Sequence, residues 1–286
     1  MTRATPAIPI ITRIQDLQPA PVAWLCDIWG VLHNGVAAFS AAVDACRAYR
    51  RQGGIVVLVS NAPRPAAAVA MQLTKLGVPQ DAYDQILTSG DVTRELLVAW
   101  KGRAIHHIGP VRDLGIFEAL DLKFCGLTDA DAIVCTGLFD DTTETAEDYR
   151  SRFAIGRQRD LPMLCANPDI HVERGGQLVQ CAGALAELYG AMGGTVHYAG
   201  KPHPEVYATA IGRISAIAGR PVGRNELLAI GDGVNTDIKG AAAERISSVY
   251  IASTVHLKAP FGAASVADLF AARSFAPTAA MPALVW

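Results

Sequence analysis

The sequence predicts an α/β protein with a parallel sheet and a second, inserted α/β unit. Short apolar runs, of the kind that strands buried on both faces show, alternate along the chain with stretches of helical periodicity. The first strand, helix and strand follow one another within the span of a single βαβ unit, and such a unit requires parallel strands. The same alternation restarts between about residues 102 and 195, which is enough sequence for a second sheet.

The first part of the chain supplies the opening βαβ unit. Residues 22–26 are wholly apolar, so we expect a buried strand that ends at Asp27. Gly30 and Gly35 then let the backbone turn tightly. Residues 40–51 combine a cap-like serine with apolar positions at helical spacing, and glycines follow them. The other elements expected here are a strand at 55–59 that ends at Ser60, a helix at 65–76, a strand at 86–88 and a helix at about 91–100.

The inserted unit has apolar runs at residues 104–108, 132–135 and 163–165, with helical stretches between them. Its first boundary is soft, because residues 101–103 do not form a low-complexity linker. After the insertion we expect a strand at 196–198, a helix at 204–218, a strand at 227–230, a last parallel strand at 249–252, and a final helix with a tail.

The composition is that of a compact globule with little net charge. Apolar residues make up 51% of the chain and charged residues 18%, which excludes a disordered chain. The formal net charge of −2 leaves no basic footprint for nucleic acid or for an anionic membrane. The scattered cysteines form no C-x-x-C pair, as is typical of reduced core residues. No apolar run reaches membrane-spanning length, and the N-terminal segment does not resemble a secretory signal, so we expect a cytoplasmic protein.

Polar side chains follow four of the expected buried runs. They are Asp27, Ser60, Lys201, and the pair Asp232 and Asp237. Each has an ordinary structural explanation: a turn aspartate, a helix cap, a surface lysine or an Asx turn. Because ligands bind at the carboxyl ends of parallel strands, the set also has a functional explanation. Carboxylates that hold Mg²⁺, with a lysine and a serine on the phosphate oxygens, are the groups that phosphoryl transfer uses.

Six motifs carry a resemblance to a known family. They are residues 27–35 (DIWGVLHNG), 59–64 (VSNAPR), 166–169 (ANPD), 183–192 (GALAELYGAM), 200–204 (GKPHP) and 231–241 (GDGVNTDIKGA). In this order the chain resembles the haloacid dehalogenase (HAD) superfamily, and within it class IIA, which includes p-nitrophenyl phosphatase-like and pyridoxal phosphatase-like enzymes. The resemblance covers nearly the whole chain. It implies a Rossmann-like parallel-sheet core of residues 1–101 and 196–286, with an inserted α/β cap domain of residues 102–195.

The resemblance also implies roles for single residues. Asp27 would be the nucleophile that forms an aspartyl phosphate. Mg²⁺ would be held by Asp27, the backbone carbonyl of Trp29, and Asp232, while Asp237 would act mostly through water. The phosphoryl oxygens of a small phosphorylated substrate would be held by Ser60, Lys201, and the backbone donors of Ile28, Trp29 and Asn61.

Two further residues are candidates for substrate contact. Arg64 could reach a second anionic group of the substrate, and a solvated arginine at a helix start is the alternative. His171, two residues after Asp169, is the candidate cap residue that faces the substrate, and a surface loop histidine is the alternative. Neither a nucleic acid nor a membrane is expected as a partner, and the sequence leaves a homo-oligomer open.

Trp29 departs from the family pattern. Family phosphatases carry a second aspartate at this position, which protonates the leaving oxygen and later activates water, and an indole can do neither. Three functions are compatible with the departure: a phosphohydrolase for substrates with good leaving groups, a catalytically impaired protein that binds a phosphorylated metabolite, and a dehalogenase-like hydrolase. The retained Asp232 and Asp237 argue against the dehalogenase, because carbon–halogen displacement by a carboxylate needs no divalent cation. They also weaken the binding-protein alternative, although such a protein could keep Mg²⁺ to hold phosphate. Another group, such as His33, could also supply the missing proton.

Overall fold

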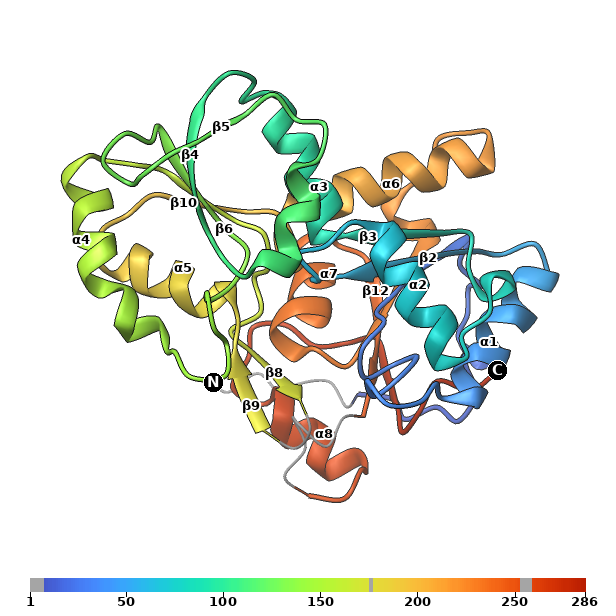
Figure 1. Ribbon diagram of the computed structural model, residues 1–286. Helices are drawn as coiled ribbons and strands as arrows, with labels where there is room; N and C mark the ends of the chain where they lie inside the picture. The colour runs from blue at the N-terminus through green and yellow to red at the C-terminus, as the bar shows by residue number, and fades with distance from the viewer. Residues whose placement is uncertain (1–7, 175–176, 253–258) are drawn as a thin grey trace. The chain divides into compact units, whose positions relative to one another are not determined.

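The structure is a computed structural model that describes residues 8–174, 177–252 and 259–286 (Figure 1). The chain divides into two compact units. The first unit contains Met1–Ser60, Ala70–Ile86 and Tyr207–Trp286, and the second contains Asn61–Val69 and Leu87–Val206. Parallel strands form the main sheet of each unit, and helices alternate with these strands along the chain. The predicted α/β fold class is confirmed.

The larger sheet belongs to the first unit apart from the end of its edge strand β3. Its strand order is β13-β12-β11-β1-β2-β3. The strands are β1 (Ala23–Cys26), β2 (Ile55–Ser60), β3 (Gln85–Thr88), β11 (Leu227–Gly231), β12 (Ser247–Ile251) and β13 (Ala279–Met281). β1 pairs in parallel with β2 on one side and with β11 on the other, and all of its residues are buried. Asp27 therefore follows a central strand at its carboxyl end, as the sequence predicts.

Helix α1 (Ser40–Arg51) shows how the apolar pattern builds the first unit. The residues expected on its apolar face are all buried: Ala42, Val43, Cys46 and Tyr49. The ring of Tyr49 stacks on Trp24 of β1, with the ring centroids 4.0 Å apart, and this contact joins the helix to the sheet. The other helical segments are α7 (Lys239–Ala243), α8 (Ala263–Phe270), short turns at Ile14–Asp16, Gln80–Ala82 and Arg224–Glu226, a π-helical turn at Val234–Ile238, and α2 (Ala66–Leu76) and α6 (Pro204–Ala218), which begin in the second unit.

The second unit contains a five-stranded parallel sheet, with strand order β10-β7-β6-β4-β5, and an antiparallel hairpin of β8 and β9. The strands are β4 (Ala104–Ile108), β5 (Lys123–Phe124), β6 (Ala132–Cys135), β7 (Met163–Cys165), β8 (His171–Arg174), β9 (Gln177–Gln180) and β10 (Val196–Tyr198). The helices are α3 (Ser89–Val98), α4 (Arg150–Gln158) and α5 (Ala182–Ala191), with short turns at Val111–Phe117 and Ala146–Tyr149. Phe153 of α4 and Tyr189 of α5 share a buried cluster with Ile133 and Met163, so both helices pack on one face of this sheet (Figure 1).

Three features of the fold are not indicated by the sequence. The strand at 196–198, which the predicted bounds assign to the core, pairs with β7 in the five-stranded sheet. The predicted last strand is followed by β13, which pairs with β12 although its residues are two alanines and a methionine without β-branching. The hairpin of β8 and β9 is also new, because its mostly polar residues lack an apolar alternation. The domain bounds at residues 101 and 195 stay a prediction.

None of the helices in the described part of the chain combines the length and the hydropathy that crossing a bilayer requires.

Candidate active site

Three carboxylates of the first unit form an acidic cluster, which we define as Asp27, Asp232 and Asp237. Among the residues that the structure describes, these three could hold a metal ion together, since one oxygen from each lies within 4.8 Å of the others. Asp27 follows β1 and Asp232 follows the neighbouring strand β11, and the N–H of Asp27 donates to the carbonyl of Ile230 at 2.8 Å. Asp237 lies on the π-helical turn that comes next. Asp232 and Asp237 are only 6% and 4% exposed.

Glycines make room for the acidic cluster. Gly30 has a positive φ of 82°, and a Cβ placed there would lie 2.3 Å from Oδ2 of Asp232. A Cβ at Gly231 would lie 2.1 Å from Cγ of Asp237. The N–H of Gly233 donates to Oδ2 of Asp237 at 3.1 Å, and a Cβ at Gly233 would lie 2.7 Å from the same oxygen. These positions require glycine because any larger residue would displace a carboxylate.

The acidic cluster fits a hard divalent cation. Three carboxylates this close repel one another, and burial strengthens the repulsion that a bound cation would relieve. The side chains of the cluster offer only oxygen, which is the donor that Mg²⁺ prefers, whereas zinc sites usually include nitrogen or sulfur. The residues expected to hold Mg²⁺ through their side chains are therefore suited to that ion and lie together in the first unit.

The loop after β1 is a compact turn around Trp29. The N–H of Gly30 donates to the carbonyl of His33 at 2.8 Å, and the N–H of His33 donates to the carbonyl of Ile28 at 3.3 Å. Trp29 and His33 form an isolated bridge within the loop. Trp29 is partly buried, whereas Ile28 is only 3% exposed. The loop that should carry the backbone donors is thus held by its own hydrogen bonds.

His33 is poorly suited to replace the missing acid. Its side chain is buried, and Nδ1 accepts a hydrogen bond from the N–H of Gly35 at 2.9 Å. Burial lowers the pKa of His33, so the imidazole is mainly neutral near pH 7. A general acid must carry a transferable proton at the working pH. These contacts argue against His33 as the proton donor.

The backbone of Lys201 is fixed in the second unit by the side chain of Asn61. The N–H of Lys201 donates to Oδ1 of Asn61 at 2.8 Å, and Nδ2 of Asn61 donates to the carbonyl of Lys201 at 2.9 Å. Nδ2 also donates to Oδ1 of Asp169 at 2.8 Å. The N–H of Asp169 in turn donates to Oδ1 of Asn167 at 3.0 Å. These contacts bring together three of the motifs found in the sequence, at residues 59–64, 166–169 and 200–204.

The other expected site residues lie on β2, in the loop before α2 and on β8. Ser60 is the last residue of β2 and is partly buried. Arg64 is partly buried in the loop before α2. Its backbone packs closely on Gly90, since a Cβ placed at Gly90 would lie 2.7 Å from backbone atoms of Arg64. His171 is exposed on β8 and pairs with Gln180 across the hairpin. Its exposure favours the alternative of a surface histidine.

Asp113 is a buried carboxylate that the sequence analysis missed. It is 3% exposed on the turn Val111–Phe117. Burial raises the pKa of Asp113 to about 6, although the nearby Arg112 and Arg64 and a hydrogen bond with Thr136 act in the opposite direction. Thr136 also contacts Nε2 of His107 at 2.9 Å, and burial lowers the pKa of His107 to about 4. Residues 111–117 (VRDLGIF) resemble an ordinary surface turn, so no local signal marks this network.

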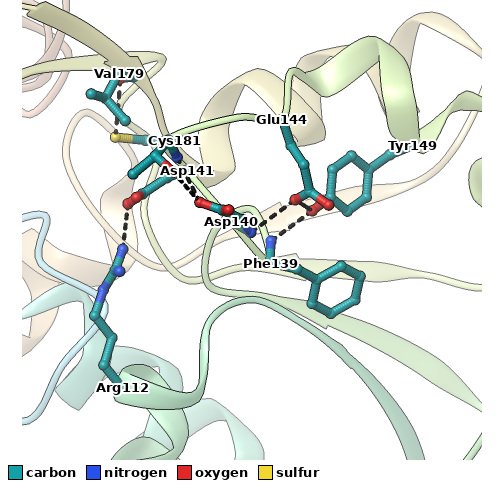
Figure 2. Close-up of polar contacts among 9 residues, drawn as sticks. Arg112, Phe139, Asp140, Asp141, Glu144, Tyr149, Val179 and Cys181 are labelled. Atoms are coloured by element: carbon teal, nitrogen blue, oxygen red, sulfur yellow. Dashed lines mark hydrogen bonds and ion pairs between the residues drawn. The ribbon is translucent and has the colours of Figure 1, made fainter.

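A second group of acidic residues lies within the loop at 139–144 of the second unit (Figure 2). Glu144 accepts hydrogen bonds from the hydroxyl of Tyr149 at 2.5 Å and from the N–H of Asp140 at 2.9 Å. Asp140 accepts further bonds from threonines of its own turn, and these bonds lower the pKa of Asp140. Asp141 forms an ion pair with Arg112. The carboxylates here stabilise a loop and do not converge on a common point.

Two family models match parts of the chain. The family model described as haloacid dehalogenase-like hydrolase matches residues 24–123, and the model described as HAD-hydrolase-like matches residues 198–276. No curated protein matches the chain. The solved structure of a haloacid dehalogenase-like family hydrolase from Brucella suis 1330 is 42% identical, with a TM-score of 0.85, and the match covers 96% of this chain and 100% of that chain.

More distant structures share the fold. A possible sugar phosphatase of the HAD superfamily from Cytophaga hutchinsonii is 18% identical, with a TM-score of 0.79, over 96% of this chain and 98% of that chain. A p-nitrophenyl phosphatase from Archaeoglobus fulgidus is 17% identical, with a TM-score of 0.71, over 93% of this chain and 97% of that chain. Because the Brucella hydrolase is 42% identical over nearly the whole sequence, the chain belongs to the haloacid dehalogenase-like hydrolase family.

Proposed function

We propose that the chain is a Mg²⁺-dependent phosphohydrolase that acts through an aspartyl phosphate on a small phosphorylated metabolite with a good leaving group. The observation that carries the proposal is the acidic cluster, in which three carboxylates lie within 4.8 Å of one another. Its glycine neighbours admit no side chain, which is expected where carboxylates must converge on an ion. The proposal keeps the division into a core of residues 1–101 and 196–286 and a cap of residues 102–195.

Residues of the acidic cluster would hold the metal. Asp27 and Asp232 would be direct ligands together with the backbone carbonyl of Trp29, and Asp237 would act mostly through water. When bound, Mg²⁺ supplies positive charge that offsets the carboxylates and the phosphoryl oxygens. The assignment is supported by the oxygen-only donor set of the cluster and by the burial of Asp232 and Asp237.

The covalent chemistry would rest on Asp27. A carboxylate oxygen of Asp27 attacks phosphorus, the bond from phosphorus to the leaving oxygen breaks, and the leaving group departs with the electron pair. Water then attacks the aspartyl phosphate, which releases phosphate and regenerates the carboxylate. Ser60, Lys201 and the N–H groups of Ile28, Trp29 and Asn61 would hold the phosphoryl oxygens during both steps. Arg64 would bind a second anionic group of the substrate, whereas the exposure of His171 favours a surface histidine over a substrate contact.

Trp29 restricts the class of substrate. An indole N–H can donate a hydrogen bond but does not transfer its proton at neutral pH, so the leaving oxygen must depart without general-acid help. Such help is usually worth about 10² to 10⁴-fold in rate. Acyl phosphates, anhydrides and phenolic esters tolerate its loss best, because their leaving groups are stable as anions. The same residue supports a second candidate, a protein that binds a phosphorylated metabolite without turning it over.

Phosphate release from a panel of acyl, aryl and alkyl phosphates, with and without Mg²⁺, tests the proposal. We expect turnover of acetyl phosphate and p-nitrophenyl phosphate that requires Mg²⁺ and disappears in the Asp27→Asn variant. The variant should still bind inorganic phosphate, because it keeps the proposed phosphate ligands. Release that is unchanged by Asp27→Asn would contradict the aspartyl phosphate. No release from any substrate by a folded protein that binds phosphate would favour the binding protein.

A further inference from the structure

The amide of Asn61 holds the backbone of Lys201 from both sides. One oxygen and one nitrogen of the side chain bond to the N–H and the carbonyl of the same residue, at 2.8 Å and 2.9 Å, across 140 positions of sequence. This is the pairing that a neighbouring strand would offer, supplied here by a single side chain. The position from which the long lysine side chain starts is therefore set by Asn61.

The orientation of the Asn61 amide is itself determined. Its Nδ2 donates to the carboxylate of Asp169 and to the carbonyl of Lys201, and these two acceptors offer no hydrogen to an amide oxygen in the same place. A flipped amide would place oxygen against two acceptors and nitrogen against the N–H of Lys201. Asp169 is oriented in turn by its own N–H, which donates to Oδ1 of Asn167 at 3.0 Å. The oxygen acceptors of Asp169 and Lys201 thus fix the orientation of the Asn61 amide.

Gly200 allows this close approach. Asn61 and Lys201 are 5% and 4% exposed, so their hydrogen bonds are shielded from water. A Cβ at Gly200 would lie 2.5 Å from Oδ1 of Asn61 and 2.5 Å from Oγ of Ser89. Ser89 is fully buried, and among the described residues its hydroxyl has no hydrogen-bond partner. Gly200 therefore lies against the side chain of Asn61, which has three hydrogen bonds, and against that of Ser89, for which the structure shows none. Asn61 and Ser89 form a matched pair for an experiment.

We propose that Asn61 is a positioning residue that places Lys201 for the phosphoryl group through its side chain. The inference rests on the proposed function, in which Lys201 binds phosphoryl oxygens and only the backbone of Asn61 does so. The ammonium of lysine ends a side chain of fixed length, so the place of the Lys201 backbone decides which points the ammonium can reach. Displacements of about 1 Å in a positioned group can cost about 10²-fold in rate.

A double-mutant cycle with orthovanadate as the probe tests the inference. Vanadate affinity is measured by calorimetry for the wild type, Asn61→Ala, Lys201→Ala and the double variant, and thermal melts establish that each is folded. We expect Asn61→Ala to weaken binding about tenfold or more, and to have almost no effect when Lys201 is already alanine. Ser89→Ala is the matched control and should leave the affinity within about twofold of the wild type, since no hydrogen bond is lost.

The outcomes separate the inference from the proposed function. If Lys201→Ala leaves vanadate affinity unchanged, Lys201 is not a phosphate ligand and both are overturned at this residue. If Lys201→Ala weakens binding but Asn61→Ala does not, the positioning role alone is wrong. If Asn61→Ala weakens binding equally in both backgrounds, Asn61 acts through its own backbone and the positioning role is again wrong. Should Asn61→Ala fail to fold, Asn61→Ser enters the same cycle, because its hydroxyl keeps one polar contact in the site.

Discussion

The two units bury carboxylates in different ways. In the first unit Asp232 and Asp237 are buried beside Asp27, so like charges converge, and glycines at positions 30, 231 and 233 leave room for their carboxylates. In the second unit Asp113 is buried near the guanidinium groups of Arg112 and Arg64, and its pKa rises to about 6. Convergence of like charge is favourable only with a cation, whereas a single buried carboxylate can be protonated instead. The first arrangement is typical of a binding site and the second of a structural network.

Adding a carboxylate to the first arrangement should have the largest effect. Trp29→Asp restores the acid that family phosphatases carry, so we expect kcat/KM for alkyl phosphates to rise by about 10² to 10⁴-fold. The steep dependence of the wild-type rate on leaving-group pKa should become flatter, because the aspartic acid protonates poor leaving groups. The measurement is a plot of log kcat/KM against leaving-group pKa for both proteins.

Trp29→Asn is the matched control for this substitution. It removes the same indole, which lies 3.5 Å from a Cβ placed at Gly35, but it supplies no acidic proton. A gain that appears in both variants would come from the space left by the indole. A wild-type plot that is already shallow would show that some other group protonates the leaving oxygen.

Neutralising one carboxylate of the acidic cluster should abolish stabilisation by metal. At a Mg²⁺ concentration about 100 times the Kd, binding adds about 2.7 kcal/mol to the free energy of unfolding. Asp232→Asn should remove the Mg²⁺-dependent rise in Tm, since it deletes a direct ligand and two of the three pairwise repulsions that the cation relieves. The measurement is a series of thermal melts with Mg²⁺ and with a chelator. An unchanged rise in Tm would place the ion elsewhere.

Two glycines provide a control that keeps all three carboxylates. Gly30 and Gly35 both have positive φ, so replacement by alanine strains the backbone at either position by about 1 to 2 kcal/mol. Only the Cβ of Gly30→Ala would meet Asp232, at 2.3 Å. Gly30→Ala should therefore lose the Mg²⁺-dependent rise in Tm, and Gly35→Ala should keep it.

Removing the isolated carboxylate should have a smaller effect, and one that depends on pH. The pKa of Asp113 is about 6 in the folded protein against 3.8 for an ordinary aspartate, so the folded state binds more protons between these values. Stability is therefore lost as pH rises through this window, and the cost is complete above it. Asp113→Asn should be more stable than the wild type by about 1 to 2 kcal/mol at pH 7, and the difference should vanish below about pH 4. Denaturant unfolding at pH 4 and pH 7 measures this, and a constant difference would exclude the titration of Asp113 as its cause.

The elements that the sequence predicts best are those whose burial is visible locally. A run of apolar residues predicts the strand before Asp27, and apolar residues at helical spacing predict the helix that contains Tyr49. The structure contains both elements. β13 is different, because it is a strand only through its partners: it pairs with β12, and the N–H of Ala280 donates to the carbonyl of Pro9 at 2.9 Å. β10 belongs to the five-stranded sheet because it pairs with β7, and its own sequence does not indicate this pairing.

The candidate site divides in the same way. Asp27, Asp232 and Asp237 stand in recognisable motifs, and the structure brings them together. The side chain of Asn61 bonds to a residue 140 positions away, so its neighbours in sequence carry no sign of that contact. Asp113 was missed because burial within a turn depends on what packs over the turn. Sequence motifs identify the candidate reacting groups, whereas the contacts of Asn61 and the burial of Asp113 emerge only from the tertiary structure.

The strand order of the larger sheet has a consequence for the synthesis of the chain. β1 pairs with β11, with Ala23 opposite Leu227, and a ribosome that adds about 5 to 20 residues per second needs about 10 to 40 s to make the residues between them. During this interval β1 presents one edge of unpaired N–H and C=O groups, on a strand that is entirely apolar. Such an edge can pair with another nascent copy. A high concentration of nascent chains therefore favours aggregation of this chain, because many unpaired β1 edges are then present at once, and expression at a low level favours the folded protein.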